Sequence, residues 1–171
     1  MSSNVKLFSK FPNEVFIETG TWSGDGVQRA IEAGFFQIKS VESSADFYEY
    51  SKNLFLEEKK VELFFGKSED HLWEMIKDVT VPITFWLDAH YSEGQTTNDF
   101  PLLKELDIIS KHPIKNHVIL IDDVRQMDTP AFGGIKREDV EKKIKNINNN
   151  YLIEYHDGYV ANDVMVAIIK E

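Results

Sequence analysis

The feature that most constrains the fold of this chain is the alternation of short apolar runs with helical patterns. Five runs have the length of buried strands, at residues 15–17, 38–41, 61–65, 83–87 and 118–121. Between them lie segments whose apolar residues recur at helical spacing, as Leu102, Leu106 and Ile109 do. Strands that alternate with helices in this way predict an α/β fold with a mostly parallel sheet, right-handed crossovers and helices on both faces.

The end of the chain departs from this alternation. Residues 151–156 and 164–169 are two further strand-like runs, and the connection 157–163 between them has no helical pattern. Two strands joined without a crossover predict an antiparallel hairpin. We therefore expect a seven-stranded sheet with this hairpin at one edge.

Three small residues mark expected helix boundaries. Gly34 is expected to end the helix that carries Val27 and Ala30, because glycine readily adopts the left-handed conformation of a helix C-terminus. Ser44 and Ser68 are expected to cap the starts of the next two helices.

Length and composition favour a single globular domain spanning residues 1–171. Apolar residues make up 42% of the chain and charged residues 28%, a balance that argues against disorder. The net charge of −10 argues against a nucleic-acid partner, and the absence of cysteine excludes disulfides and thiolate sites. No apolar run approaches the roughly 20 residues of a membrane span, and the N-terminus lacks a signal-peptide pattern. These features predict a cytoplasmic protein with no membrane partner.

A glycine-rich turn follows the first predicted strand. Glu18, Gly20 and Gly24 form an E-x-G-x-x-x-G pattern between this strand and the next helix. Phosphate-binding turns usually present bare backbone amides and often a lysine. The acid at the strand tip disfavours an anion, so the pattern favours a nucleoside cofactor with cationic or hydroxyl groups.

Four of the five predicted parallel strands end in carboxylates. Glu42 follows the second strand, 22 positions after Gly20. This is near the roughly 20-residue offset at which an acid reaches a ribose diol in dinucleotide folds. Asp88 follows the fourth strand, and the pair Asp122–Asp123 follows the fifth. Because ligands of open α/β sheets bind at the carboxyl ends of the strands, we expect these acids to meet at one rim.

The five β/α units finished by a hairpin resemble class I S-adenosylmethionine-dependent methyltransferases over nearly the whole chain. In that family the glycine turn wraps the methionine part of the cofactor, and the acid after the second strand holds the ribose. The segment after the third strand lies near the adenine, although Lys67 stands here where the family often has an acid. The resemblance implies that S-adenosyl-L-methionine is bound by Glu18, Thr19, Gly20, Thr21, Ser23, Gly24, Glu42, Ser43, Ser68, Glu69 and Asp88.

The acids after the fourth and fifth strands are candidates for metal binding and catalysis. Asp88, Asp122 and Asp123 are expected to crowd together, which either raises a pKa or binds a cation, and an all-oxygen site suits Mg²⁺, Ca²⁺ or Mn²⁺. These positions resemble the metal ligands of metal-dependent O-methyltransferases that act on sugars and hydroxylated small molecules. The resemblance implies that Mg²⁺ or Mn²⁺ orients a substrate hydroxyl. Asp88 and His90 are the expected catalytic residues, with His90 as general base.

Two loops at the same rim, 91–98 and 124–134, are expected to contact the acceptor. Tyr91, Gln95 and Arg125 are the expected substrate-binding residues, because they offer hydrogen bonds to a hydroxylated acceptor such as a sugar. The remaining histidines are expected at the surface or at helix ends: His71, His112, His117 and His156.

Several alternatives stay open at this point. The chain fits a metal-independent methyltransferase for another acceptor, although Asp88-Ala-His-Tyr91 lacks the Asn/Asp-Pro-Pro-Tyr/Phe sequence common in N-methyltransferases. It also fits a non-catalytic binding module with the same fold. A nicotinamide oxidoreductase is disfavoured, because Gly20 and Gly24 are four residues apart and do not form G-x-G-x-x-G. Only about a dozen residues precede the first strand, so we expect an acceptor site that is open, completed by a second copy in a homo-oligomer, or covered by a fused neighbouring domain.

Overall fold

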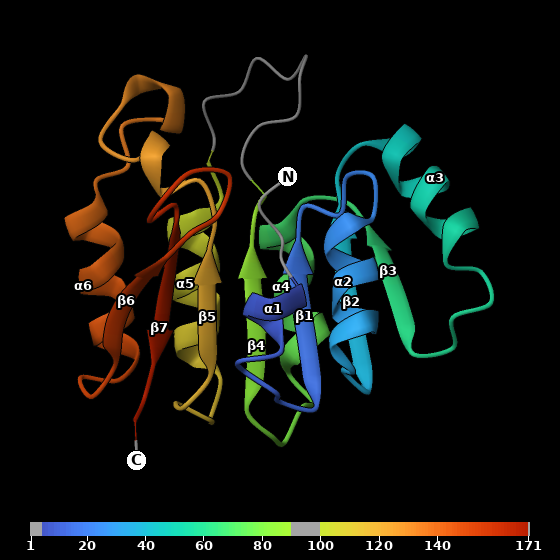
Figure 1. Ribbon diagram of the computed structural model, residues 1–171, viewed down its shortest axis with the longest axis horizontal. Coiled ribbons are helices and arrows are strands. Elements are labelled where there is room, and N and C mark those ends of the chain that lie inside the picture. The colour runs from blue at the N-terminus through green and yellow to red at the C-terminus, as the bar shows by residue number, and fades with distance from the viewer. Residues whose placement is uncertain (1–4, 90–99, 171) are drawn as a thin grey trace.

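The computed structural model describes residues 5–89 and 100–170. Seven strands form one sheet in the order β3-β2-β1-β4-β5-β7-β6 (Figure 1). Their bounds are β1 Val15–Thr19, β2 Gln37–Glu42, β3 Val61–Phe65, β4 Ile83–Leu87, β5 Val118–Ile121, β6 Leu152–His156 and β7 Val164–Ile168. The neighbouring strands from β3 to β5 pair in parallel, whereas β7 pairs antiparallel with both β5 and β6. The predicted parallel sheet and C-terminal hairpin are therefore confirmed.

The register of the central strands aligns their carboxyl ends. Thr19, the last residue of β1, pairs with Val41 of β2 on one side and with Leu87 of β4 on the other. Leu87 in turn pairs with Ile121, the last residue of β5. The residues that follow β1, β4 and β5 consequently leave the sheet at the same rim, although they are far apart in the sequence.

Helices cover both faces of the sheet, as the alternation predicted (Figure 1). Their bounds are α1 Val5–Phe8, α2 Asp25–Ala33, α3 Ala45–Leu54, α4 Ser68–Ile76, α5 Leu102–Lys111 and α6 Arg137–Ile147, with single 3-10 turns η1 Val124–Gln126 and η2 Pro130–Phe132. The larger apolar core joins α4, α5 and α6 to one face of the sheet. A smaller core, in which Phe8, Phe16 and Trp86 pack together, joins α1 and α2 to the other face. Among the described residues, no helix has the length and apolarity needed to cross a membrane.

The expected helix boundaries are largely confirmed. Gly34 ends α2 with φ 92°, the left-handed conformation that glycine adopts without a Cβ clash. Ser44 is the N-cap residue of α3, although its side chain makes no capping hydrogen bond. The expected cap of α4 is wrong by one position, because Lys67 is the N-cap and Ser68 is the first helical residue.

The surface or helix-end location expected for the other histidines holds for His112, which is the C-cap residue of α5, although its side chain is buried. The expectation is wrong for His117, which is fully buried just before β5. The Ile83 amide donates to His117 Nδ1 at 3.1 Å. On the tautomer that this bond requires, His117 Nε2 donates to His112 Nδ1 at 3.0 Å, and His112 Nε2 donates to the Ile76 carbonyl at 3.1 Å. The pair thus links the ends of α4 and α5 to the starts of β4 and β5. Burial lowers the pKa of His117 to about 3, and the neighbouring His112 adds to the effect.

Candidate active site

The glycine turn after β1 is held against the ends of the neighbouring strands. Gly20 has φ 85°, and its amide donates to the Val41 carbonyl at 2.9 Å. A Cβ on Gly20 would lie 2.6 Å from the backbone oxygen of Asp88, so only glycine fits between β2 and the segment after β4. Gly24, with φ 83°, is the N-cap residue of α2. The turn therefore brings the start of α2 close to the rim.

Glu18 lies buried beneath this turn. Its Oε2 accepts a hydrogen bond from Ser40 Oγ at 2.7 Å. Its Oε1 occupies the space that a side chain on Gly26, in the first turn of α2, would need. Burial raises the pKa of Glu18 to about 8, and the charges of Glu42 and Asp25 add to that rise, while the Ser40 hydrogen bond opposes it. Glu18 is thus an acid whose charged form lacks a positive partner among the groups that shift its pKa.

Glu42, after β2, fixes the outer part of the turn. Its Oε2 accepts a hydrogen bond from the Trp22 amide at 2.8 Å, and its Oε1 accepts one from the Ser44 amide at 2.7 Å. The Trp22 carbonyl accepts a further bond from Ser51 Oγ at 3.0 Å, which helps to hold Trp22 at a positive φ of 45°. A carboxylate has about four acceptor positions, so these two bonds do not use the full acceptor capacity of Glu42, which is buried.

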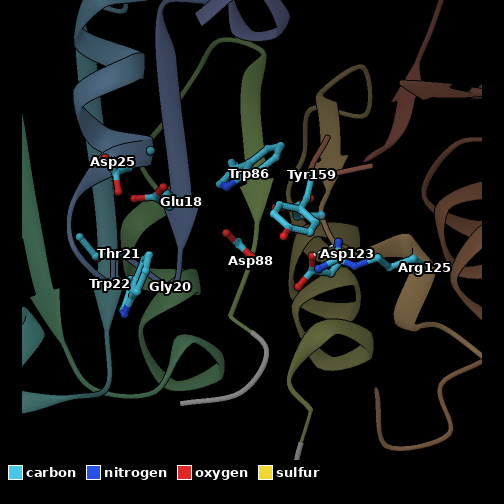
Figure 2. A pocket seen from close by; sticks show the side chains of 12 residues that line it. Glu18, Gly20, Thr21, Trp22, Asp25, Trp86, Asp88, Asp123, Arg125 and Tyr159 are labelled. Carbon is cyan, nitrogen blue, oxygen red and sulfur yellow. Dashed lines mark ion pairs between the residues drawn. The ribbon is translucent and has the colours of Figure 1, made fainter. Parts of the chain in front are cut away.

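A cavity of about 430 Å³ opens at the carboxyl ends of β1, β4 and β5. This volume is in the range of small-molecule sites. Figure 2 shows Glu18 and Asp25 on one side of the cavity, Trp86 and Asp88 in its middle, and Tyr159 with the Asp123–Arg125 pair on the other. The residues that line it are Glu18, Gly20, Thr21, Trp22, Asp25, Gly26, Trp86, Asp88, Asp122, Asp123, Arg125 and Tyr159.

The acids of β4 and β5 meet at this cavity, as expected. Burial raises the pKa of Asp88 well above its ordinary value, and the charges of Asp122, Asp123 and Glu18 raise it further. Burial also raises the pKa of Asp122 to about 7. Asp122 Oδ1 is buried and has no hydrogen-bond partner among the residues that the structure describes. These buried acids therefore favour the binding of a cation or a proton at the rim.

Arg125 and Asp163 complete the acidic rim. The Arg125 guanidinium lies 2.5 Å from Asp123 Oδ1 and also pairs with Asp163 Oδ2. Carboxylate oxygens of Asp122, Asp123 and Asp163 all lie within 4.8 Å of one another. The sequence pointed to Asp88 as the third member of this group, and the structure adds Asp163 from the far end of the chain.

The predicted site lacked the lining residues Asp25, Gly26, Trp86 and Tyr159, and also Asp163 of the acidic group. Trp86 carried a usable signal, since it lies two positions before Asp88 on the same strand and must face the same side of the sheet. Tyr159 and Asp163 belong to the β6–β7 connection, and the sequence carries no signal that this connection reaches the rim. Tyr159 is 68% exposed, and its ring lies 5.2 Å from the Arg125 guanidinium carbon.

Several expected cofactor residues lie outside the cavity lining. Thr19 and Ser68 are buried near Glu105 of α5. Burial raises the pKa of Glu105 to about 7, and the hydroxyls of Ser68 and Thr19 oppose this rise. Glu69 pairs with Lys104 of α5 at 3.3 Å. Ser23 is bonded to Asp25 at 2.7 Å, and Ser43 is half-buried after β2. Gly24 and Glu42 are also absent from the residues that line the cavity. The expected residues His90, Tyr91 and Gln95 lie outside the described residues.

Comparisons with known proteins agree on the fold. No protein-family model and no curated protein sequence matches the chain. Solved structures do match: the methyltransferase PaMTH1 from Podospora anserina, bound to S-adenosylhomocysteine, has a TM-score of 0.70 at 16% identity, covering 98% of this chain and 76% of that one. The O-methyltransferase TomG from Streptomyces achromogenes, in complex with S-adenosylmethionine, gives 0.66 at 15%, covering 98% and 78%. A spermidine synthase from Thermotoga maritima gives 0.66 at 10%, covering 99% and 58%.

The chain thus has the Rossmann-like fold of class I S-adenosylmethionine-dependent methyltransferases. The TM-scores of 0.66–0.70 establish the fold, which a spermidine synthase shares. At identities of 10–16%, the reaction has to be argued from the site itself.

Proposed function

We propose that this chain is an S-adenosylmethionine-dependent O-methyltransferase that methylates a hydroxyl of a sugar or another polyhydroxylated small molecule, with assistance from a divalent cation. The observation that carries the proposal is the single cavity in which the glycine turn after β1 faces the acidic rim of β4 and β5. Such a cavity can hold a cationic nucleoside cofactor and a hydroxyl acceptor side by side. PaMTH1 and TomG, which share the fold, were solved with S-adenosylhomocysteine and S-adenosylmethionine.

The cofactor half consists of Glu18, Glu42 and the turn between β1 and α2. The two oxygens of Glu42 are fixed by the Trp22 and Ser44 amides, and their remaining acceptor capacity would serve the ribose hydroxyls. Glu18 and Asp25 line the same side of the cavity and favour the positively charged methionine part. When bound, S-adenosylmethionine supplies an electrophilic methyl group, and S-adenosylhomocysteine remains after transfer.

The reaction half must receive one proton from the acceptor hydroxyl as its oxygen forms the bond to the methyl carbon. Asp88 lines the cavity and has a raised pKa, which makes its carboxylate a stronger base than an exposed aspartate. His90 follows two residues later and is retained as the proposed general base, with Asp88 beside it.

The rim fits a divalent cation. Asp88 and Asp122 would hold Mg²⁺ or Mn²⁺ together with Asp123, and such an ion lowers the pKa of a bound hydroxyl. The support lies in Asp122 Oδ1, a buried oxygen that lacks a partner within residues 5–89 and 100–170. The raised pKa values of Asp88 and Asp122 point in the same direction, since a cation would relieve the repulsion.

The acceptor side favours a ring that carries hydroxyls. Tyr159 and Trp86 line this part of the cavity and offer apolar faces, while Asp88, Asp122 and Arg125 offer hydrogen bonds. A sugar combines an apolar ring face with hydroxyl groups and so matches both kinds of surface.

Titration calorimetry with S-adenosylhomocysteine, with and without Mg²⁺, tests the proposal. We expect the wild-type protein to bind, and Glu42→Gln to bind at least tenfold more weakly, because an amide cannot accept at both positions. Glu49→Gln, on the exposed side of α3, is the matched control and should bind like the wild type. Absence of binding by the wild-type protein would reject the cofactor assignment. If the protein binds, methyl transfer from labelled S-adenosylmethionine to a panel of sugars tests the acceptor.

A metal-independent methyltransferase is the second candidate, and one observation favours it. Arg125 already pairs with Asp123, so part of the acidic rim is neutralised without an added ion. Methyl transfer that is unchanged by a chelator would select this alternative.

A further inference from the structure

The guanidinium of Arg125 occupies the place where an added cation would be expected. It contacts Asp123 Oδ1 at 2.5 Å and Asp163 Oδ2 at once, and these oxygens belong to the group that lies within 4.8 Å together with Asp122. A planar guanidinium suits this role, because its donors can serve two carboxylates at the same time.

The same contacts hold the β6–β7 connection to the rim. The Arg125 amide donates to Asp163 Oδ1 at 3.1 Å, and the Val124 amide donates to the Asp163 carbonyl at 2.9 Å. The Tyr159 ring, four residues before Asp163, lies against the Arg125 guanidinium. Arg125 therefore joins the acidic group to the residue that forms one wall of the cavity.

A second observation marks the group as a ligand site. Asp122 is only 2% exposed, lines the cavity, and leaves Oδ1 without a hydrogen-bond partner in the described part of the chain. A buried carboxylate oxygen without a partner is costly, and a cation between the three acids would satisfy it. Arg125 satisfies Asp123 and Asp163 but leaves this oxygen unpaired.

We propose that Asp163 joins Asp122 and Asp123 in the divalent-cation site and that Arg125 is its internal competitor, so that an ion binds by displacing the guanidinium and thereby removes the contact that holds the Tyr159 ring. Asp163 and Arg125 thereby set both the affinity for the ion and the position of the cavity wall. This inference rests on the proposed function in that both assign an ion to Asp122 and Asp123.

Calorimetric titration of the cofactor-free protein with MnCl₂ tests the competition directly. Arg125→Gln removes the competitor and is expected to bind Mn²⁺ at least tenfold more tightly than the wild type. Arg137→Gln is the matched control, because Arg137 also lies over a tyrosine ring, that of Tyr155, and is not among the residues that line the cavity. It should bind Mn²⁺ like the wild type.

Arg125→Lys keeps the inference testable if the glutamine variant fails to fold. Lysine preserves the charge but cannot hold two carboxylates with a planar fork, so we expect Mn²⁺ affinity at least threefold above the wild type. Affinity equal to or below the wild type in every folded Arg125 variant would overturn the competition.

Hydrogen exchange provides the readout for the wall. Mg²⁺ should increase exchange at the Gly158 amide of the wild type, because its bond to the Val160 carbonyl closes the turn that carries Tyr159, and the Arg125 guanidinium no longer holds that ring. Unchanged or slower exchange at saturating Mg²⁺ would contradict the displacement. Both measurements omit the cofactor, so their outcome is independent of whether S-adenosylhomocysteine binds.

Discussion

At the scale of single residues, the site is a set of buried acids without enough positive charge. The pKa of Glu18 is raised to about 8 and that of Asp122 to about 7, in both cases chiefly because burial disfavours the charged form. Each raised pKa means that the empty protein is less stable when the acid is ionised. A cationic ligand offsets this cost, so the same acids that weaken the empty fold favour the ligand.

Gly26 shows how closely the space around Glu18 is filled. Alanine normally stabilises a helix by up to about 1 kcal/mol over glycine, but here its Cβ would overlap Glu18 Oε1. We expect Gly26→Ala to destabilise the protein by about 1–3 kcal/mol, measured by urea unfolding. In a Glu18→Ala background the same change should become neutral or stabilising. An equal loss in both backgrounds would show that Glu18 is not the obstacle.

At the scale of elements, the sequence predicted each strand because each is a short apolar run that ends in a turn or acid. It also predicted that Asp88 meets the pair Asp122–Asp123, because these acids directly follow neighbouring parallel strands. The contribution of the β6–β7 connection could not be predicted. Its approach to the rim depends on β7 entering the sheet beside β5 and on the pairing of Asp163 with Arg125, which are tertiary contacts. The burial of His117 was missed for the same kind of reason.

Tyr159 offers a test of the wall that this connection forms. Its ring is exposed, so Tyr159→Ala should leave the fold and the affinity for S-adenosylhomocysteine unchanged. The acceptor KM should rise about tenfold, since an aromatic contact of about 1 kcal/mol or more is lost. Steady-state kinetics with the best acceptor of the sugar panel measures this. Tyr50→Ala, at an exposed tyrosine of α3, is the control. A weakened affinity for S-adenosylhomocysteine with an unchanged acceptor KM would show that Tyr159 contacts the cofactor and not the acceptor.

Substitution in the His112–His117 pair tests how the N-terminal ends of β4 and β5 are joined to the helices. His117→Ala leaves the buried Ile83 amide without its partner and removes one of the two donors to His112 Nδ1, so we expect a loss of about 2–4 kcal/mol at pH 7.5. The folded pKa of His117, about 3, lies below the ordinary 6.5. Its contribution is therefore complete above pH 6.5 and is lost as the pH falls toward 3. The difference between wild type and variant in urea unfolding should shrink over that window, and a constant difference would contradict a neutral His117 in the folded protein.

At the scale of the whole molecule, the negative charge is concentrated at the cavity. The chain carries a net charge of −10, and five of the residues that line the cavity at the rim are carboxylates, with Arg125 as the cation among them. Field lines from these acids converge in a cavity with low-dielectric walls, which raises the local concentration of cationic ligands. The fold places this field at the point where β1 and β4 lie side by side, so the proposed cofactor and acceptor would both experience it.

Proton release on cofactor binding follows from this shared field. The positive charge of S-adenosylmethionine favours the ionised form of nearby acids and so lowers the pKa of Glu18 from about 8. At pH 7 the empty protein holds a proton there that the complex gives up, so affinity should increase as the pH rises from 6 to 8. Calorimetry in two buffers of different ionisation enthalpy measures the protons released, and we expect between half a proton and about one. Glu18→Gln should abolish most of the release while Glu49→Gln should not. Affinity that is flat or falls over this range would mean that Glu18 does not face the charged end of the cofactor.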